Sequence, residues 1–167
     1  MAMFALAAGV NTGSVLAEQR WGLLSRAFGG RAWKAHLAAI TPLWALAVMR
    51  LWRLEPSGRW PLPAWLRWLG WGITLAALVV WGQSVAAMGL VRFANGACFG
   101  WATGERIRDG GFRRLRNPIY DSYALALVGS GLRKGDARYL LLALESFVLL
   151  NLIEAPIEDR CLITPPR

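Results

Sequence analysis

The feature that most constrains this chain is a long uncharged stretch, residues 69–91. As an α-helix rising 1.5 Å per residue, the stretch would span about 34 Å, which exceeds the roughly 30 Å of a bilayer hydrocarbon core. A helix folded in water needs only one apolar stripe, whereas a helix in lipid is apolar all round. The stretch therefore predicts a transmembrane helix.

The basic residues have a placement that is typical of membrane proteins. The formal net charge is +9 and 56% of the residues are hydrophobic. The arginines fall between the apolar runs, as Arg50, Arg53 and Arg67 do, and do not form one stripe along a soluble face. Many of the 10 Trp also lie near the ends of apolar runs. Both placements suit the membrane–water boundary, so membrane lipid is the expected partner and nucleic acid is excluded.

Cysteine and histidine are too few for the common metal and triad sites. Cys98 and Cys161 are far apart, no CxxC occurs, and His36 is the single histidine. A classical zinc site and a Ser-His-Asp triad are therefore excluded, and no metal is predicted.

Four apolar segments predict an all-α, polytopic integral membrane bundle with about four transmembrane helices. They are Leu37–Trp52, Leu69–Val91, Ile119–Leu132 and Ala137–Glu154, of which the last two form a C-terminal helical hairpin. Pro156 is expected to end or bend the last helix. We divide the chain into an N-terminal interfacial segment (1–36), two transmembrane helices (37–91) and a C-terminal region with the hairpin and an acidic end (92–167).

The flanking charges predict an orientation. The N-terminal segment lacks the basic start of a secretory signal, so we do not predict a cleaved leader. With four spans, the N-terminus, residues 92–117 and the C-terminus share the side that is richer in Lys and Arg. The positive-inside rule then places both termini in the cytoplasm, and we expect a bacterial inner membrane.

Three polar or glycine-rich clusters lie on that predicted side. The first carries Gly96, Gly100 and Gly104, whose spacing allows a helix or a ligand to approach the backbone closely. Helix packing, including self-association of the chain, and ligand binding are both compatible with it.

The second and third clusters carry charge. Residues 111–120 read GFRRLRNPIY, in which Pro118 suits the first turn of a helix whose free N–H groups could bind a carboxylate. Near the end of the chain, Asn151, Glu154 and Glu158 would share one helical face and could hold an amine. A solvated helix end is the alternative for these acids.

The order of these clusters resembles the membrane-embedded S-adenosylmethionine-dependent methyltransferases, which include phosphatidylethanolamine N-methyltransferase and isoprenylcysteine carboxyl methyltransferase. Members of that superfamily have a glycine-bearing segment, then a Gly-Phe/Tyr-Arg-x-x-Arg-His/Asn-Pro-Met-Tyr motif, then a hydrophobic hairpin that ends in paired glutamates. The resemblance covers about residues 89–162 and implies methyl transfer to a lipid-like acceptor, namely a phospholipid amine or a lipidic carboxylate or thiol.

The resemblance also implies roles for particular residues. Arg116 and Glu158 would be catalytic, and the cofactor S-adenosylmethionine would be bound by Gly100, Gly111, Arg116, Asn117, Tyr120, Glu154 and Glu158. Two alignments of the acidic end remain open, because either Glu154 or the pair Glu158-Asp159 could match the paired glutamates.

Two other functions remain open. Asp121-Ser122 and Ala155 depart from the superfamily pattern, which would suit a degenerate homologue or a non-catalytic membrane subunit. A membrane oxidoreductase of the NnrU or sterol-reductase type shares the late Arg-x-Pro-x-Tyr region, but no glycine-rich dinucleotide turn is present.

Overall fold

The fold is all-α, as the sequence predicts. A computed structural model describes residues 2–53, 60–102 and 107–163, and every regular element within these ranges is helical. The chain forms two compact units that are discontinuous in sequence. Unit 1 contains residues 1–53, 88–106 and 153–167, and unit 2 contains residues 54–87 and 107–152. The functional regions 1–36, 37–91 and 92–167 stay a prediction.

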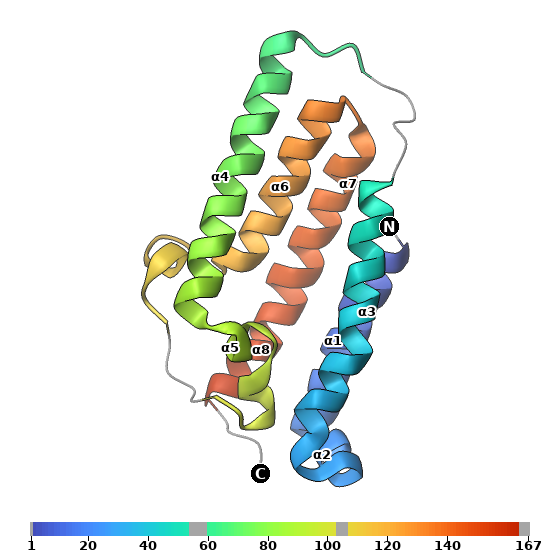
Figure 1. The fold of residues 1–167 in the computed structure, drawn as a ribbon, viewed down its shortest axis with the longest axis vertical. Helices are drawn as coiled ribbons and strands as arrows, with labels where there is room; N and C mark the ends of the chain where they lie inside the picture. The colour runs from blue at the N-terminus through green and yellow to red at the C-terminus, as the bar shows by residue number, and fades with distance from the viewer. Residues whose placement is uncertain (1, 54–59, 103–106, 164–167) are drawn as a thin grey trace. The chain divides into compact units, whose positions relative to one another are not determined.

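Unit 1 is built around a pair of long helices, which lie side by side in Figure 1. Its elements are α1 (Ala2–Trp21), α2 (Leu23–Phe28), η1 (Gly29–Arg31), α3 (Ala32–Trp52), α5 (Leu90–Phe93), η2 (Gly96–Phe99) and α8 (Ala155–Ile163). Helix α1 contacts α3, α2, α8 and η2. Its buried residues follow the i, i+3, i+4, i+7 pattern of one helical face: Phe4, Ala7, Ala8, Asn11, Val15 and Glu18.

Unit 2 contains α4 (Ala64–Met88), the 3₁₀ turn η3 (Gly110–Arg113), α6 (Pro118–Lys134), α7 (Ala137–Ser146) and most of the π-helical segment η4 (Phe147–Glu154). Helices α6 and α7 form the predicted hairpin (Figure 1). Gly135 closes α6 with φ of 64°, a conformation that favours glycine. Asp136 then caps α7 by accepting a hydrogen bond from the backbone N–H of Arg138.

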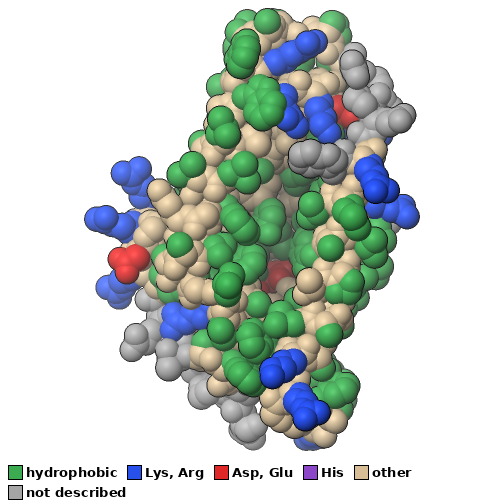
Figure 2. Space-filling view, in the orientation of Figure 1, with side chains coloured by type: hydrophobic (Ala, Val, Ile, Leu, Met, Phe, Trp, Pro, Cys, Tyr) green, Lys and Arg blue, Asp and Glu red, His purple; other side chains and the backbone are tan. Residues whose placement is uncertain are grey.

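Three of the described helices are long and apolar enough to cross a membrane. They cover Leu23–Leu51, Ala64–Met88 and Ala137–Arg160. Helix α6, which contains the predicted third span, has 17 residues and a length of about 25 Å, and it is not among the three. Figure 2 shows hydrophobic side chains over much of the helical surface, as a bilayer-facing protein requires.

Two predicted boundaries need correction. Helix α4 begins at Ala64 rather than Leu69 and ends at Met88 rather than Val91, because Gly89 leaves helical geometry with φ of 76°. Of the two outcomes expected at Pro156, a bend or an end of the last helix, the end is excluded, since α8 continues to Ile163. Proline lacks an N–H and its ring crowds the carbonyl four residues before it, and the wider π-helical turns of η4 relieve that crowding.

Candidate functional site

The glycines of the GFRRLRNPIY motif allow the chain to lie directly on α4. A Cβ atom built on Gly111 would collide with the Ser84 hydroxyl oxygen and would lie 2.8 Å from Cβ of Pro118. Gly110 has φ of 59°, and a Cβ there would lie 2.8 Å from the Gln83 carbonyl oxygen. Close packing inside unit 2 is therefore the direct reason for both glycines.

The residues after the glycines surround the start of α6. Pro118 is the first residue of the helix and is buried, while Arg116 is exposed and Tyr120 is half-buried. The Asn117 side chain does not cap the helix. Its Nδ2 donates to Oδ1 of Asn151, in η4, over 3.0 Å.

The Asn151 amide also faces an acid. Its side chain is a hydrogen-bond partner of Asp121, in the first turn of α6. Asn117, Asp121 and Asn151 thus form a polar cluster at the start of α6, next to exposed Arg116.

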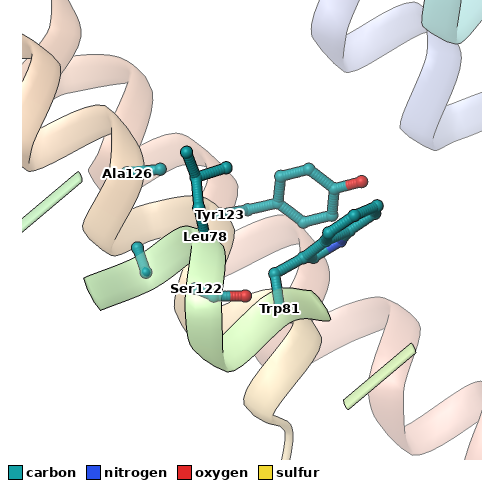
Figure 3. Close-up of a pocket in the computed structure, with 6 residues that line it drawn as sticks. Leu78, Trp81, Ser122, Tyr123 and Ala126 are labelled. Atoms are coloured by element: carbon teal, nitrogen blue, oxygen red, sulfur yellow. The ribbon is translucent and has the colours of Figure 1, made fainter. Parts of the chain in front are cut away.

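A cavity of about 170 Å³ lies between α4 and α6 (Figure 3). Its lining residues are Ala77, Leu78, Trp81, Ser122, Tyr123 and Ala126. Ser122 donates its hydroxyl to the carbonyl oxygen of Ile119 over 2.8 Å, which leaves an essentially apolar lining. In Figure 3 the rings of Trp81 and Tyr123 lie close together at this cavity. Its chemistry suits hydrocarbon rather than a charged group.

Unit 1 holds the other predicted site residues. Glu154 is buried, with 3% of its surface exposed, and its carboxylate accepts hydrogen bonds from Asn11 Nδ2 and, over 3.4 Å, from the Thr12 hydroxyl. Asn11 Oδ1 in turn accepts from Nδ2 of Asn95 over 3.0 Å. Glu158 lies one helical turn later and is half-buried.

The glycine cluster of unit 1 is a tight turn rather than a helix-packing stripe. Gly96 is buried, and a Cβ there would lie 2.6 Å from the Val91 carbonyl oxygen. Gly100 is exposed and has φ of 74°. Gly104 lies outside the described residues.

The predicted site residues therefore fall in two groups. Unit 2 contains Gly111, Arg116, Asn117 and Tyr120, whereas unit 1 contains Gly100, Glu154 and Glu158. Sequence reasoning did not identify Asn11, Thr12 or Asn95 as partners of the acid. The available signal was the pair Asn11-Thr12, which interrupts the apolar residues of α1.

No group of three or more His, Cys, Asp or Glu side chains that could hold a metal ion occurs among the described residues. Cys98, in the core of unit 1, is disulfide-bonded.

The lengths and the apolar surfaces of the helices identify an integral membrane protein. The polar residues described above lie at helix ends and at junctions between helices. Residues 65–164 match the phospholipid methyltransferase family, which is more than half of the chain, so the chain belongs to this family. It is thus a membrane methyltransferase, in agreement with the predicted superfamily. No curated protein and no solved structure matches the chain.

Proposed function

We propose that the protein transfers a methyl group from S-adenosylmethionine to a lipid-like acceptor in the membrane. The observation that carries this proposal is the polar start of α6 within the matched region, where exposed Arg116 adjoins Asn117. S-adenosylmethionine carries an amino-acid carboxylate, an amine and a sulfonium-bound methyl group. Charged and amide side chains can recognise the first two of these groups.

At the α6 end, Arg116 would pair with the cofactor carboxylate through charge-assisted hydrogen bonds. Asn117, held by its hydrogen bond to Asn151, would orient the same group. Tyr120 and Gly111 would shape the adenosine pocket, and Gly100 stays a predicted cofactor residue of unit 1.

At the acidic end, Glu154 and Glu158 would pair with the cofactor amine. We assign Glu158 the further role of accepting a proton from the methyl acceptor, because half-buried Glu158 is more accessible than buried Glu154. The acceptor heteroatom forms a bond to the methyl carbon as the sulfur–carbon bond breaks, and the chain's task is to align the two.

The acceptor is proposed to be lipid-like, with its reactive group an amine, a carboxylate or a thiol. The apolar cavity between α4 and α6 supports this class, since it could take part of a hydrocarbon chain. The exposed apolar residues of α4 would let such a molecule enter from the bilayer.

We propose a bacterial inner membrane as the location. Cytoplasmic placement of both termini needs an even number of crossings, so it requires short α6 to cross together with the three longer helices. A thin or locally thinned bilayer would accommodate a helix of about 25 Å.

Arg116→Ala tests the proposal. Removing the guanidinium should weaken S-adenosylmethionine binding by about 2–4 kcal/mol, roughly 30- to 1000-fold, as for loss of charge-assisted hydrogen bonds in a partly dry site. Binding can be measured by calorimetry on the detergent-solubilised chain.

Arg114→Ala is the matched control, because Arg114 is also exposed and lies two residues earlier in the same connection. It should leave the affinity unchanged. Equal losses in the two variants would mean that the arginines only anchor the protein to lipid. A parent chain that binds no S-adenosylmethionine would favour the non-catalytic subunit or the oxidoreductase instead.

A further inference from the structure

The hairpin end of unit 2 carries an arginine whose charge is unmatched. In Figure 1 the hairpin turn and the start of α4 lie at this same end of unit 2. The side chain of Arg133, near the end of α6, is half-buried and forms no ion pair or hydrogen bond with the residues that the structure describes. Its Nε atom is buried without an acceptor, which leaves the two terminal amino groups as the accessible end of the guanidinium. A charge in partly dry surroundings costs stability unless a counter-charge reaches it.

The packing of α6 against α4 holds Arg133 in place. A Cβ atom on Gly70 would lie 2.7 Å from the Arg133 backbone nitrogen, so the two helices touch at this point. The side chain of Arg133 then crosses the next residue of α4, and its guanidinium carbon lies 4.3 Å from the centroid of the Trp71 ring. An aromatic face attracts a cation and leaves the outer edge of the planar guanidinium available to an anion.

The neighbouring charges of the hairpin turn do not neutralise Arg133. Asp136 is the one acid in the sequence 133–138, and it forms its ion pair with Arg138 over 2.7 Å. Lys134 adds another cation, whose ammonium group donates to the Tyr139 hydroxyl. Cations therefore outnumber acids at this end of unit 2, which favours an anionic ligand.

An apolar row follows the basic groups along α4. Arg67, Trp71, Leu75 and Val79 are spaced four apart, so they form one row on the helix surface, and all four are exposed. From Trp71 to Val79 the row covers about 12 Å. In a bilayer the basic start of the row would lie in the headgroup layer and its apolar part in the hydrocarbon. The row thus has the polarity of a phospholipid.

We propose that Arg133, held on Trp71, and Arg67 bind the phosphate of an anionic phospholipid whose acyl chain lies along the apolar row of α4. A guanidinium fork matches two phosphate oxygens, which favours arginine for this ligand. A zwitterionic headgroup also carries an amine, and the nearby acid, Asp136, is already paired. The site lies at the other end of α6 from Asn117, about 25 Å along the helix, so the bound lipid is not the methyl acceptor.

The experiment measures lipid binding to the full chain in a neutral detergent, by native mass spectrometry and by the unfolding temperature. The added lipid is phosphatidylglycerol, and phosphatidylcholine with the same acyl chains is the comparison. The parent should bind phosphatidylglycerol about tenfold more tightly, and this lipid should raise the unfolding temperature more than phosphatidylcholine does. Inorganic phosphate at equal ionic strength should not raise the unfolding temperature, because it has no acyl chain to lie on α4.

Arg133→Met removes the guanidinium and keeps an apolar side chain. This variant should weaken phosphatidylglycerol binding about tenfold, as for the loss of hydrogen bonds to a charged group. Without lipid, its unfolding temperature should equal or exceed that of the parent, because an unmatched charge has been removed.

Arg138→Met is the matched control, because it makes the same change in net charge at the same turn. It should lower the unfolding temperature, since Arg138 pairs with Asp136, and it should keep the parent's preference for phosphatidylglycerol. Equal losses of phosphatidylglycerol binding in the two variants would overturn the inference, because net charge alone would then attract the lipid.

Three further outcomes would also overturn the inference. Equal affinity of the parent for both lipids would exclude recognition of an anionic headgroup. Stabilisation by inorganic phosphate equal to that by phosphatidylglycerol would assign the site to a free anion. An Arg133→Met variant that is destabilised without lipid but keeps the lipid preference would make this arginine a structural contact of α4.

Discussion

The two units bury different kinds of groups. Unit 1 encloses polar side chains from several elements, among them Asn11, Glu18, His36 and Glu154. Each of these side chains has a hydrogen-bond partner: His36 Nδ1, for example, lies 2.8 Å from the Ser14 hydroxyl oxygen. Unit 2 also buries polar residues, three serines and Asp136, but its helices α4 and α6 approach each other through glycine. A Cβ on Gly70 would lie 2.6 Å from the Gly129 carbonyl oxygen.

This contrast between the two units predicts which substitutions each unit can tolerate. A buried polar network is stable only while every donor has an acceptor, so unit 1 should be sensitive to the removal of single polar groups. A glycine contact between two backbones has no room for added atoms, so unit 2 should be sensitive to the addition of a single methyl group.

The largest expected effect is that of Gly70→Ala in unit 2. The new methyl group would lie 2.6 Å from the Gly129 carbonyl oxygen and 2.7 Å from the Arg133 backbone nitrogen. Backbone atoms cannot move aside as a flexible side chain can, so we expect a loss of about 3 kcal/mol in unfolding free energy. Equilibrium unfolding in mixed detergents measures this free energy.

Gly72→Ala is the matched control, two residues along the same helix. A Cβ on Gly72 meets no atom within 4 Å, and alanine is the better helix former by about 1 kcal/mol. Its stability should equal or exceed that of the parent. If Gly70→Ala proved equally harmless, α4 and α6 would not depend on a glycine contact.

A smaller loss is expected for Glu18→Ala in unit 1. The buried Glu18 carboxylate accepts from the backbone N–H groups of Leu24 and Ser25, over 2.9 and 3.0 Å, and from the Ser25 hydroxyl. It thereby serves the free N–H groups at the start of α2, as a capping residue does.

Removing this cap should cost about 2 kcal/mol. Amide hydrogen exchange should rise in residues 23–28, whereas exchange in α6 and α7 should stay at the parent level. Faster exchange in unit 2 as well would mean that the two units do not unfold separately.

The smallest effect is expected at the hairpin turn of unit 2, and it depends on pH. The Arg138 guanidinium, hydrogen-bonded to Asp136 over 2.7 Å, holds the pKa of that carboxyl below its usual value. A lowered folded-state pKa stabilises the fold above the ordinary value of about 3.9. This stabilisation is lost as the pH falls through the lowered pKa.

Asp136→Asn tests this dependence, because asparagine caps helices about as well as aspartate but carries no charge. The variant should lose about 1 kcal/mol or less at pH 7 and should lose less additional stability than the parent on acidification to pH 2. Equilibrium unfolding of both proteins at pH 7 and pH 2 measures these free energies. Parallel pH curves for the two proteins would exclude Asp136 as the source.

Local patterns predicted the elements that depend on local chemistry. Residues 69–91 identified α4 because a long uncharged run has few alternatives to a membrane helix. The hairpin followed from two apolar runs around Gly135-Asp136, and Pro118 correctly marked the start of α6. The motif at 111–120 likewise indicated the family that the match over residues 65–164 identifies.

Local patterns say less where two parts of the chain adjust to each other. Pro156 was expected to end or bend the last helix, and the π-helical turns of η4 let the helix continue past it. Gly111 was read as a cofactor residue, and that role stays a prediction. Its contact with Ser84 gives it a packing reason that the motif alone does not reveal.

By itself the sequence determined the all-α membrane class and the methyltransferase family, because apolar length, charge placement and a short motif are each encoded within a few tens of residues. Only the tertiary structure joined Asn11 to Glu154, 143 positions apart. Their hydrogen bond exists because α1 packs against the end of the chain, and no periodicity along α1 specifies which distant acid its amide will meet.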